Sequence, residues 1–385
     1  MGFPFWRKKI EEEEGEKAKK EYRPFDVYLL FVTLLLVFVG LVMVFSSSAV
    51  LAKERYQDGY FFLKKEILFV FIGLAAMMAA KKISYRIYWK CTYWFLLLSL
   101  VPMILVLFVG IGGGQEEVRR WLRLGPFTFQ PSEPVKLAVI IFVSYALAKK
   151  GDKIRSFTRG FLPVVAVSGV YIGLILLQKD LGSAFTLGMI VFLMLFISGT
   201  RLSFLIGSVL VSVPILYYLL FSVEFRRQRM LAFLDPWKYQ LGTGFQIIQS
   251  FVAFQSGGLT GVGLGEGKQK LFYLPEAHTD FIFSVVGEEL GLLGVMGVVV
   301  LFTIFIFRGL LVTFRTKDLF GMYLAFGLTC LIGLQAFVNI GVVMGLLPTK
   351  GLPLPFISYG GTSLVTCLMA VGILLNVSTD AGEEF

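Results

Sequence analysis

The sequence predicts an all-α polytopic membrane protein with about ten transmembrane helices in a single domain. Of its 385 residues, 56% are hydrophobic, and the mean hydropathy is +0.78. Soluble domains are usually only about 45–50% apolar. Apolar stretches of about 18 or more residues, the length of a helix that spans a bilayer, recur along the whole chain. Length and composition therefore indicate one membrane domain and not two soluble ones.

Ten apolar ranges follow one another between charged or glycine-rich segments. They are 27–48, 61–80, 88–110, 133–148, 161–177, 182–199, 202–221, 280–306, 319–345 and 358–377. Residues 1–24 precede them and are rich in charge, so we expect a cytoplasmic N-terminal tail there and one transmembrane domain over 25–385.

The short basic loops predict the topology. KKISYR (81–86), KKGDKIRSFTR (149–159), Arg201 and FRTKD (314–318) alternate along the chain in the way that cytoplasmic loops do. Both termini would then be cytoplasmic. A large extracellular loop, residues 222–279, would connect the seventh and eighth spans. Within it, GFQIIQSFVAFQSGG (244–258) has apolar residues at helical spacing and predicts an amphipathic helix on the membrane surface.

The net charge of +10 fits membrane topology and contact with anionic lipid headgroups. No basic stretch is interleaved with aromatic residues as a nucleic-acid groove would require, so we expect no nucleic acid partner. The three cysteines lie in apolar runs without a CxxC or Cys/His cluster, which predicts neither disulfides nor a metal site. The GVGLGEGK segment does not follow a strand of a βαβ unit, so nucleotide binding is not expected.

Ionisable residues at or within membrane spans indicate a functional site. Glu133 and Lys136 share one helix face, and Asp180 lies between two spans. An ion pair that only fixes helix packing remains an alternative for these three. Glu288 and Glu289 are expected mainly to bond to a neighbouring helix.

Asp280 begins the eighth apolar range, directly after the only histidine in the chain, His278, and Thr279. Asp280 could cap the helix, or Thr279 could cap it and leave Asp280 facing a cavity. We expect His278 to orient Asp280 or a substrate phosphate. Upstream, Arg120 could bind phosphate, and Trp121 could stack on a sugar or anchor at the interface.

These residues at one membrane face fit an anionic amphiphile such as a lipid pyrophosphate sugar. A carboxylate can take a proton from a sugar hydroxyl, and cations can stabilise the departing pyrophosphate, which amounts to inverting glycosyl transfer. The residues alone would also allow a flippase or an ion-coupled transporter.

Several long motifs resemble the SEDS family (shape, elongation, division and sporulation proteins) in order along nearly the whole chain. Their details resemble its FtsW and SpoVE members more than RodA. The matching stretches are RRWLRLGPFTFQPSEPVKL, LLQKDLGSA, RMLAFLDPW, LPEAHTDFIFSVVGEELG and LLPTKGLPLPFISYGGTS.

The resemblance implies a peptidoglycan glycosyltransferase at the outer face of the bacterial plasma membrane, acting in cell division or elongation. It would polymerise lipid II and release undecaprenyl pyrophosphate, with Asp280 as the catalytic residue. The motifs place further residues at the substrate: Arg120, Trp121, Gln130, Ser132, Glu133, Lys136, Asp180, His278, Thr279, Lys350 and Ser358. A lipid II flippase and a non-catalytic scaffold of the cell-wall machinery are the alternatives.

The implied partners are a class B penicillin-binding protein, whose transpeptidase crosslinks the glycan, other membrane proteins of the divisome or elongasome, and membrane lipids. A divalent cation such as Mg²⁺ is also implied, although the sequence contains no metal-binding cluster that would predict it.

Overall fold

The computed structural model describes residues 25–112, 118–125, 127–271, 273–349 and 351–380. The predicted N-terminal tail, residues 1–24, lies outside them. The helices are α2 (Val27–Tyr56), α3 (Phe61–Lys82), α4 (Arg86–Val109), α5 (Ser132–Lys150), α6 (Leu162–Leu177), α7 (Leu181–Ile197), α8 (Leu202–Phe221), α9 (Glu224–Leu234), α10 (Phe245–Gly257), α11 (Ile282–Arg315), α12 (Leu319–Val343) and α13 (Gly361–Ser378).

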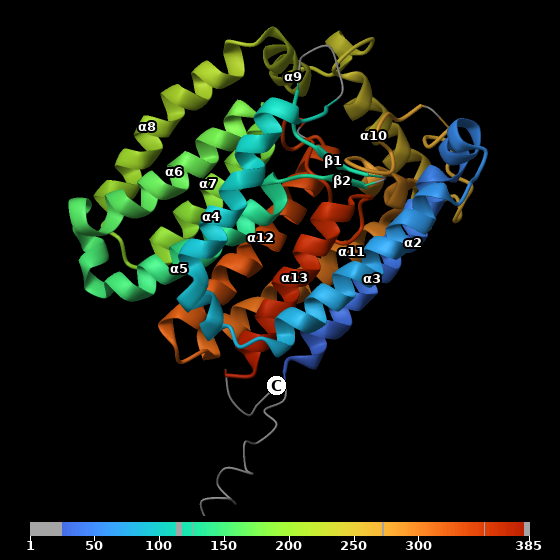
Figure 1. Cartoon of the computed structure of the whole chain (residues 1–385). Helices are drawn as coiled ribbons and strands as arrows, with labels where there is room; N and C mark the ends of the chain where they lie inside the picture. Colours follow the sequence, from blue (N-terminus) through green and yellow to red (C-terminus); the bar gives the residue numbers. More distant parts are fainter. Residues whose placement is uncertain (1–24, 113–117, 126, 272, 350, 381–385) are drawn as a thin grey trace, which may run out of the picture.

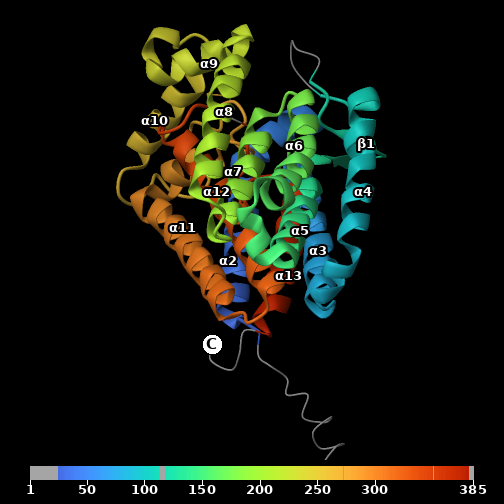
Figure 2. The same ribbon diagram turned by 90° about the vertical axis from the view of Figure 1, so that its left-hand side faces the viewer.

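The helices form a bundle (Figures 1 and 2). Each predicted apolar range falls on a helix of its own, while α9 and α10 lie in the long loop between α8 and α11. The all-α prediction misses a small antiparallel hairpin of β1 (Leu122–Leu124) and β2 (Phe127–Phe129), in which Leu122 pairs with Phe129. Hairpin and loop helices gather at one end of the bundle (Figure 1).

Among the described residues, seven helices are long and apolar enough to cross a membrane. They are α2, α4, α6 with the turn preceding it, α8, α11, α12 and α13. Helix α7 is apolar but has 17 residues, and α3 and α5 carry several charged side chains. The multi-pass architecture is therefore evident, and the count of ten spans stays a prediction.

Three helices form the interior of the bundle. Of the 18 most apolar consecutive residues in each helix, 67% are buried in α12 and 72% in α13, whereas only 6% are buried in α8. Most side chains of α5 are also buried. Small residues let helices approach, since a Cβ on Gly372 of α13 would lie 2.3 Å from the Met77 carbonyl oxygen of α3. Helix α8 lies at the periphery with apolar side chains exposed around it.

The two described chain ends meet at the end of the bundle opposite the hairpin (Figure 1). The backbone N–H of Asp26 donates to Ser378 Oγ at 3.0 Å. Tyr85, in the basic loop 81–86, donates from its hydroxyl to Asp380 at 2.8 Å. The predicted basic loops after α3, α5 and α11 also lie at this end, so these loops share one side of the bundle as the topology prediction requires.

Helix α11 runs nine residues beyond the predicted end at 306. The predicted range ends just before Arg308, a charged residue in the apolar run. In the structure Arg308 Nε lies 2.8 Å from Asp26 Oδ2. A charge that is paired with a distant residue can remain inside an otherwise apolar helix, and sequence periodicity does not reveal such a partner.

Helix α11 is interrupted at Gly291, which has φ 63° and ψ −161°. The glycine-rich segment 258–265 fills the interruption, because Val262 N donates to the Glu288 carbonyl oxygen at 3.0 Å and Leu292 N to the Gly258 carbonyl oxygen at 2.9 Å. Broken helices at membrane depth need such internal partners for their backbone.

The sequence predicts that the acidic pair bonds to a neighbouring helix, and Glu289 does accept from Ser46 Oγ of α2 at 2.8 Å. The other contacts of the pair come from the loop after α10. Glu289 forms a buried ion pair with Lys270 at 2.6 Å, and Glu288 accepts from the backbone N–H of Lys268 at 2.7 Å. The GVGLGEGK segment is thus part of the helix interruption.

The amphipathic helix predicted in the long loop is present as α10. Its buried side chains, such as Ile247 and Ile248, lie toward the protein, and Ser250 bonds to Ser284 of α11 at 2.8 Å. The buried face is therefore covered by the protein itself, which differs from the expected helix whose apolar face enters the lipid.

Candidate active site

Asp280 lies in the turn that leads into α11, at the end of the bundle that carries the hairpin. The helix begins at Ile282, and its first residue is preceded by Phe281, without a side-chain cap. Both capping predictions are therefore wrong: neither Asp280 nor Thr279 caps α11, because Phe281 lies between Asp280 and the first helical residue and takes the cap position. Thr279 Oγ1 instead donates to Glu276 at 2.7 Å.

The carboxylate of Asp280 faces the loop before α13. A Cβ built on Gly351 would lie 3.1 Å from Asp280 Oδ2. Within the described part of the chain, no hydrogen bond or ion pair to this carboxylate is found. Crowding by the surrounding protein and the nearby Glu276 raise the pKa of Asp280 to about 7, while Arg229 and Arg120 oppose the rise. A carboxylate with this pKa can exchange a proton near neutral pH.

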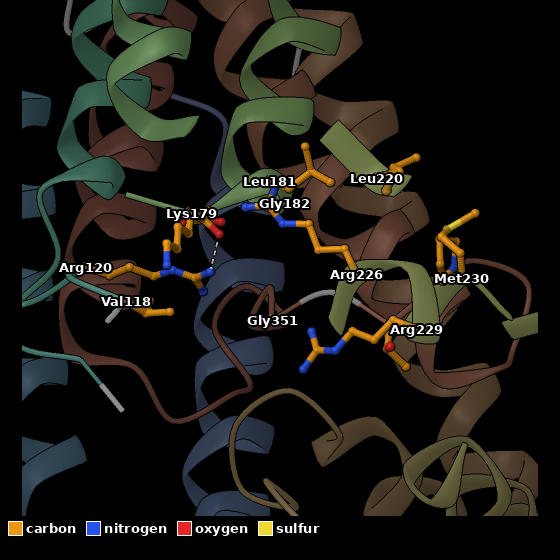
Figure 3. A pocket seen from close by; sticks show the side chains of 13 residues that line it. Val118, Arg120, Lys179, Leu181, Gly182, Leu220, Arg226, Arg229, Met230 and Gly351 are labelled. Atoms are coloured by element: carbon orange, nitrogen blue, oxygen red, sulfur yellow. Dashed lines mark hydrogen bonds between the residues drawn. The ribbon is translucent and has the colours of Figure 1, made fainter. Parts of the chain in front are cut away.

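An open pocket adjoins this carboxylate through Gly351. Its charged lining residues are Arg120, Lys179, Asp180, Arg226 and Arg229. In Figure 3, Arg226 and Arg229 approach the pocket from α9, and Arg120 approaches from the segment before β1. Four cationic side chains thus surround one cavity, which suits an anionic ligand such as a phosphate or pyrophosphate.

Two of these charged residues are held by the turn between α6 and α7. The guanidinium of Arg120 donates to the carbonyl oxygen of Lys179 (Figure 3) and to that of Gln178. Asp180 caps α7 by accepting from Ser183 N at 3.0 Å. The cap fixes the carboxylate of Asp180, so the structure gives this residue a local structural role at the edge of the pocket.

Arg229 is the cation whose environment is most closely tied to Asp280. Burial lowers its pKa, and the carboxylate of Asp280 acts in the opposite direction. Sequence reasoning missed Arg226 and Arg229 although they stand in the basic run FRRQR. Lys179 was missed too, although it directly precedes Asp180. The signal was the density of positive charge in segments expected to be extracellular.

His278 packs between aromatic rings. Its ring centroid lies 4.9 Å from that of Phe62 and 5.8 Å from that of Tyr359. Burial lowers its pKa, and Arg55 acts in the same direction against Glu276, so the imidazole is neutral at pH 7. These ring contacts do not include Asp280, so the expectation that His278 orients Asp280 or a substrate phosphate stays a prediction.

The remaining predicted residues divide between the rim and the interior. Trp121 forms a bridge with Ile111, and the backbone N–H of Gln130 donates to Thr362 Oγ1 at 3.2 Å. Glu133 and Lys136 form a buried ion pair at 2.7 Å on α5, with Ser132 buried beside them. None of these five lines the pocket, whose described walls come from other residues. Lys350 lies outside the described residues.

Ser358 does not need a ligand to satisfy its hydroxyl. Its Oγ donates to the Thr279 carbonyl oxygen and accepts from Leu354 N at 2.8 Å. Asn339 of α12, which the sequence did not single out, donates from Nδ2 to the Asp280 carbonyl oxygen at 2.8 Å. Its signal was an amide side chain within an apolar helix.

The pocket is a poor fit for Mg²⁺. Mg²⁺ binds through carboxylates and other oxygen ligands. Here Asp180 is engaged as a cap, and the pocket contains four cationic side chains. Among the described residues, no group of three or more histidine, cysteine or acidic side chains could hold a metal.

Comparison with known proteins decides the family. Residues 26–383 match the sequence model of the FtsW/RodA/SpoVE cell cycle proteins. The chain belongs to this family. It is 49% identical over 360 residues to a probable peptidoglycan glycosyltransferase FtsW of Geobacter metallireducens, covering 94% of this chain and 96% of that one. Stage V sporulation protein E of Bacillus subtilis is 41% identical, covering 92% and 96%.

Solved structures agree with the sequence comparison. A chain from a peptidoglycan synthase complex that coordinates polymerization and crosslinking superposes with a TM-score of 0.77 and 30% identity, covering 94% of this chain and 99% of that one. Rod shape determining protein RodA of Thermus thermophilus gives 0.68 and 26% with the same coverage. The family resemblance found in the motifs is confirmed, including its FtsW-like character.

Proposed function

We propose that this protein is a peptidoglycan glycosyltransferase that polymerises lipid II at the outer face of the bacterial plasma membrane and releases undecaprenyl pyrophosphate. The observation that carries the proposal is the position of Asp280, a carboxylate with a pKa near 7 beside a pocket lined by four cationic side chains. The names of the FtsW relatives support the same activity.

The arrangement accounts for the chemistry as follows. Asp280 takes the proton from the acceptor sugar hydroxyl. The hydroxyl oxygen forms a bond to the anomeric carbon of the donor, and the bond from that carbon to the pyrophosphate oxygen breaks. Arg120, Arg226 and Arg229 stabilise the negative charge on the departing pyrophosphate. The proton remains on Asp280, and the configuration at the anomeric carbon is inverted. None of these steps requires a metal ion.

The proposed orientation follows from the charges. The two described chain ends lie together with the basic loops, which favours a cytoplasmic position for both termini, ten spans and an extracellular loop 222–279. The pocket would then face the outside, where lipid II is polymerised. The exposed apolar surface of α8 is available to lipid, and the synthase-complex relative supports a class B penicillin-binding protein as partner.

A lipid II flippase is the second candidate, favoured by the buried Glu133–Lys136 ion pair, since transporters place charges inside the bundle. Asp280, however, lies at one end of the bundle and not along a path through it. Polymerisation needs a proton acceptor at the surface, so the position of Asp280 favours the transferase.

The test is glycan synthesis from labelled lipid II by the purified protein with its transpeptidase partner. Asp280→Ala is expected to fold and to lose at least about a hundredfold in rate, because general bases contribute about 10²–10⁴-fold. The matched control is Asp235→Ala on the same loop, whose carboxylate serves an exposed backbone N–H. A liposome translocation assay completes the experiment. Normal polymerisation by Asp280→Ala would contradict the proposal, and translocation without polymerisation would favour the flippase.

A further inference from the structure

Three consecutive main-chain carbonyl groups at Asp280 and the two residues before it accept hydrogen bonds from distant segments. Tyr359 N donates to the His278 carbonyl oxygen at 3.0 Å. Ser358 Oγ donates to that of Thr279, and Asn339 Nδ2 donates to that of Asp280 at 2.8 Å. Ordinary turns satisfy such carbonyls locally or with water, whereas here every partner comes from a segment about 60 or more residues away in the chain.

Asn339 has a second bond that connects the catalytic turn to the pocket wall. The same Nδ2 donates to the Leu352 carbonyl oxygen at 2.7 Å. Leu352 directly follows Gly351, the residue that faces Asp280 Oδ2. One buried amide group, 2% exposed, therefore spans both sides of the contact between the carboxylate and the wall.

We propose that Asn339 is a positioning residue that sets the spacing between the Asp280 carboxylate and the pocket wall at Gly351. Ser358 holds the same turn through its bond to the Thr279 carbonyl oxygen. The inference rests on the proposed function. Both amide hydrogens are used in bridging two main-chain carbonyls, so no rotation of the side chain can release one segment without losing a bond. A carboxylate that must approach a sugar hydroxyl closely depends on such fixed support, because a shift of about 1 Å can reduce the rate about a hundredfold.

Asn376 provides a matched control at the other end of the bundle. Its side chain also connects two main-chain groups, since Nδ2 donates to the Lys81 carbonyl oxygen at 2.7 Å and Oδ1 accepts from Tyr85 N at 2.7 Å. Asn376→Ala therefore removes comparable bonds without touching the turn of Asp280.

The experiment measures kcat and KM for lipid II, the pH profile of the rate and the thermal unfolding midpoint for the purified full chain with its partner. The variants are Asn339→Ala, the nearly isosteric Asn339→Asp, and Asn376→Ala. Asn339→Asp keeps the volume but retains at most one donor, the O–H of a protonated carboxyl, so it cannot bridge both carbonyls. We expect both Asn339 variants to lower kcat at least about tenfold with KM changed less than about threefold. In Asn339→Ala the acidic limb of the profile moves to lower pH, because the released turn admits water to Asp280.

Asn376→Ala is expected to lower the unfolding midpoint. It should keep the kcat and the pH profile of the unsubstituted protein, because the substitution leaves the charged groups around Asp280 unchanged: Glu276, Arg120, Arg229 and Asp180. Equal loss of kcat in Asn339→Ala and Asn376→Ala, or an unmoved pH profile in Asn339→Ala, would overturn the inference. If Asn339→Ala does not fold, Ser358→Ala replaces it, with the same expected loss of kcat, and an unchanged kcat overturns the inference.

Asp280→Ala separates this inference from the proposed function. If that variant polymerises lipid II normally, the catalytic assignment fails. If it is inactive while the Asn339 and Ser358 variants keep full kcat, only the positioning inference fails.

Discussion

Two aspartates at opposite ends of the bundle each precede a long helix, yet their surroundings differ. Asp26 caps α2 by accepting from Leu29 N at 2.9 Å and pairs with Arg308 at 2.8 Å. Asp280 caps no helix, and the described residues give its carboxylate no hydrogen bond. The first carboxylate is satisfied by the fold, and the second is held by its main chain while its side chain remains available. The difference separates a stabilising acid from a reactive one.

The largest expected effect on stability concerns Asp26, whose carboxylate is already paired in the fold. Asp26→Asn keeps the cap acceptor but removes the negative charge that faces Arg308, so it should lower the free energy of unfolding by about 2 kcal/mol, the size of a hydrogen bond to a charged group. Glycan synthesis per folded molecule should be unchanged. Thermal unfolding in detergent measures the loss. The control is Asp58→Asn, which breaks the exposed pair with Lys64 and should matter much less. Equal effects of the two substitutions would contradict the assigned role of Asp26.

At the reactive end, Gly351→Ala should reduce the rate of glycan synthesis about tenfold, because misplacing a reacting group by a fraction of an ångström is costly. Its new methyl group would lie 3.1 Å from Asp280 Oδ2. Gly173→Ala in α6 is the matched control, since nothing lies within 4 Å of its Cβ. Unchanged synthesis by Gly351→Ala would show that the carboxylate tolerates displacement.

The smallest expected effect is a gain in stability. The pKa of Asp280 is raised to about 7 from its ordinary value of 3.8, so its ionised form is disfavoured in the folded state. That ionisation destabilises the fold progressively as pH rises from about 4 to about 7. Asp280→Asn should therefore raise the unfolding midpoint at pH 8 and have little effect at pH 4. A fall at pH 8 would mean that the carboxylate stabilises the fold.

The sequence predicted the helices well because membrane spans are marked by continuous apolar runs. It did not predict the full length of α11, since the pairing of Arg308 with Asp26 joins residues 282 positions apart. Asp280 was found through its motif, but the role of Thr279 as a cap was wrong because the start of a helix depends on the turn geometry before it. Asn339 escaped notice because its partners are main-chain carbonyls 59 and 13 residues away.

The pocket cations illustrate the same limit. Arg120 stands in a long motif and was identified, whereas Arg226 and Arg229 look like ordinary charges of a surface helix until α9 is placed over the turn before α7. Local sequence gives the residue types that chemistry needs, and the long-range contacts select which of them meet.

The pH dependence of kcat/KM for lipid II tests the central claim most directly, because it reports the pKa of the base in the free enzyme. With Asp280 as that base, the rate should be level above about pH 7 and fall about tenfold for each unit below it. A rate that stays level down to about pH 5 would contradict the claim that the Asp280 carboxylate accepts the proton.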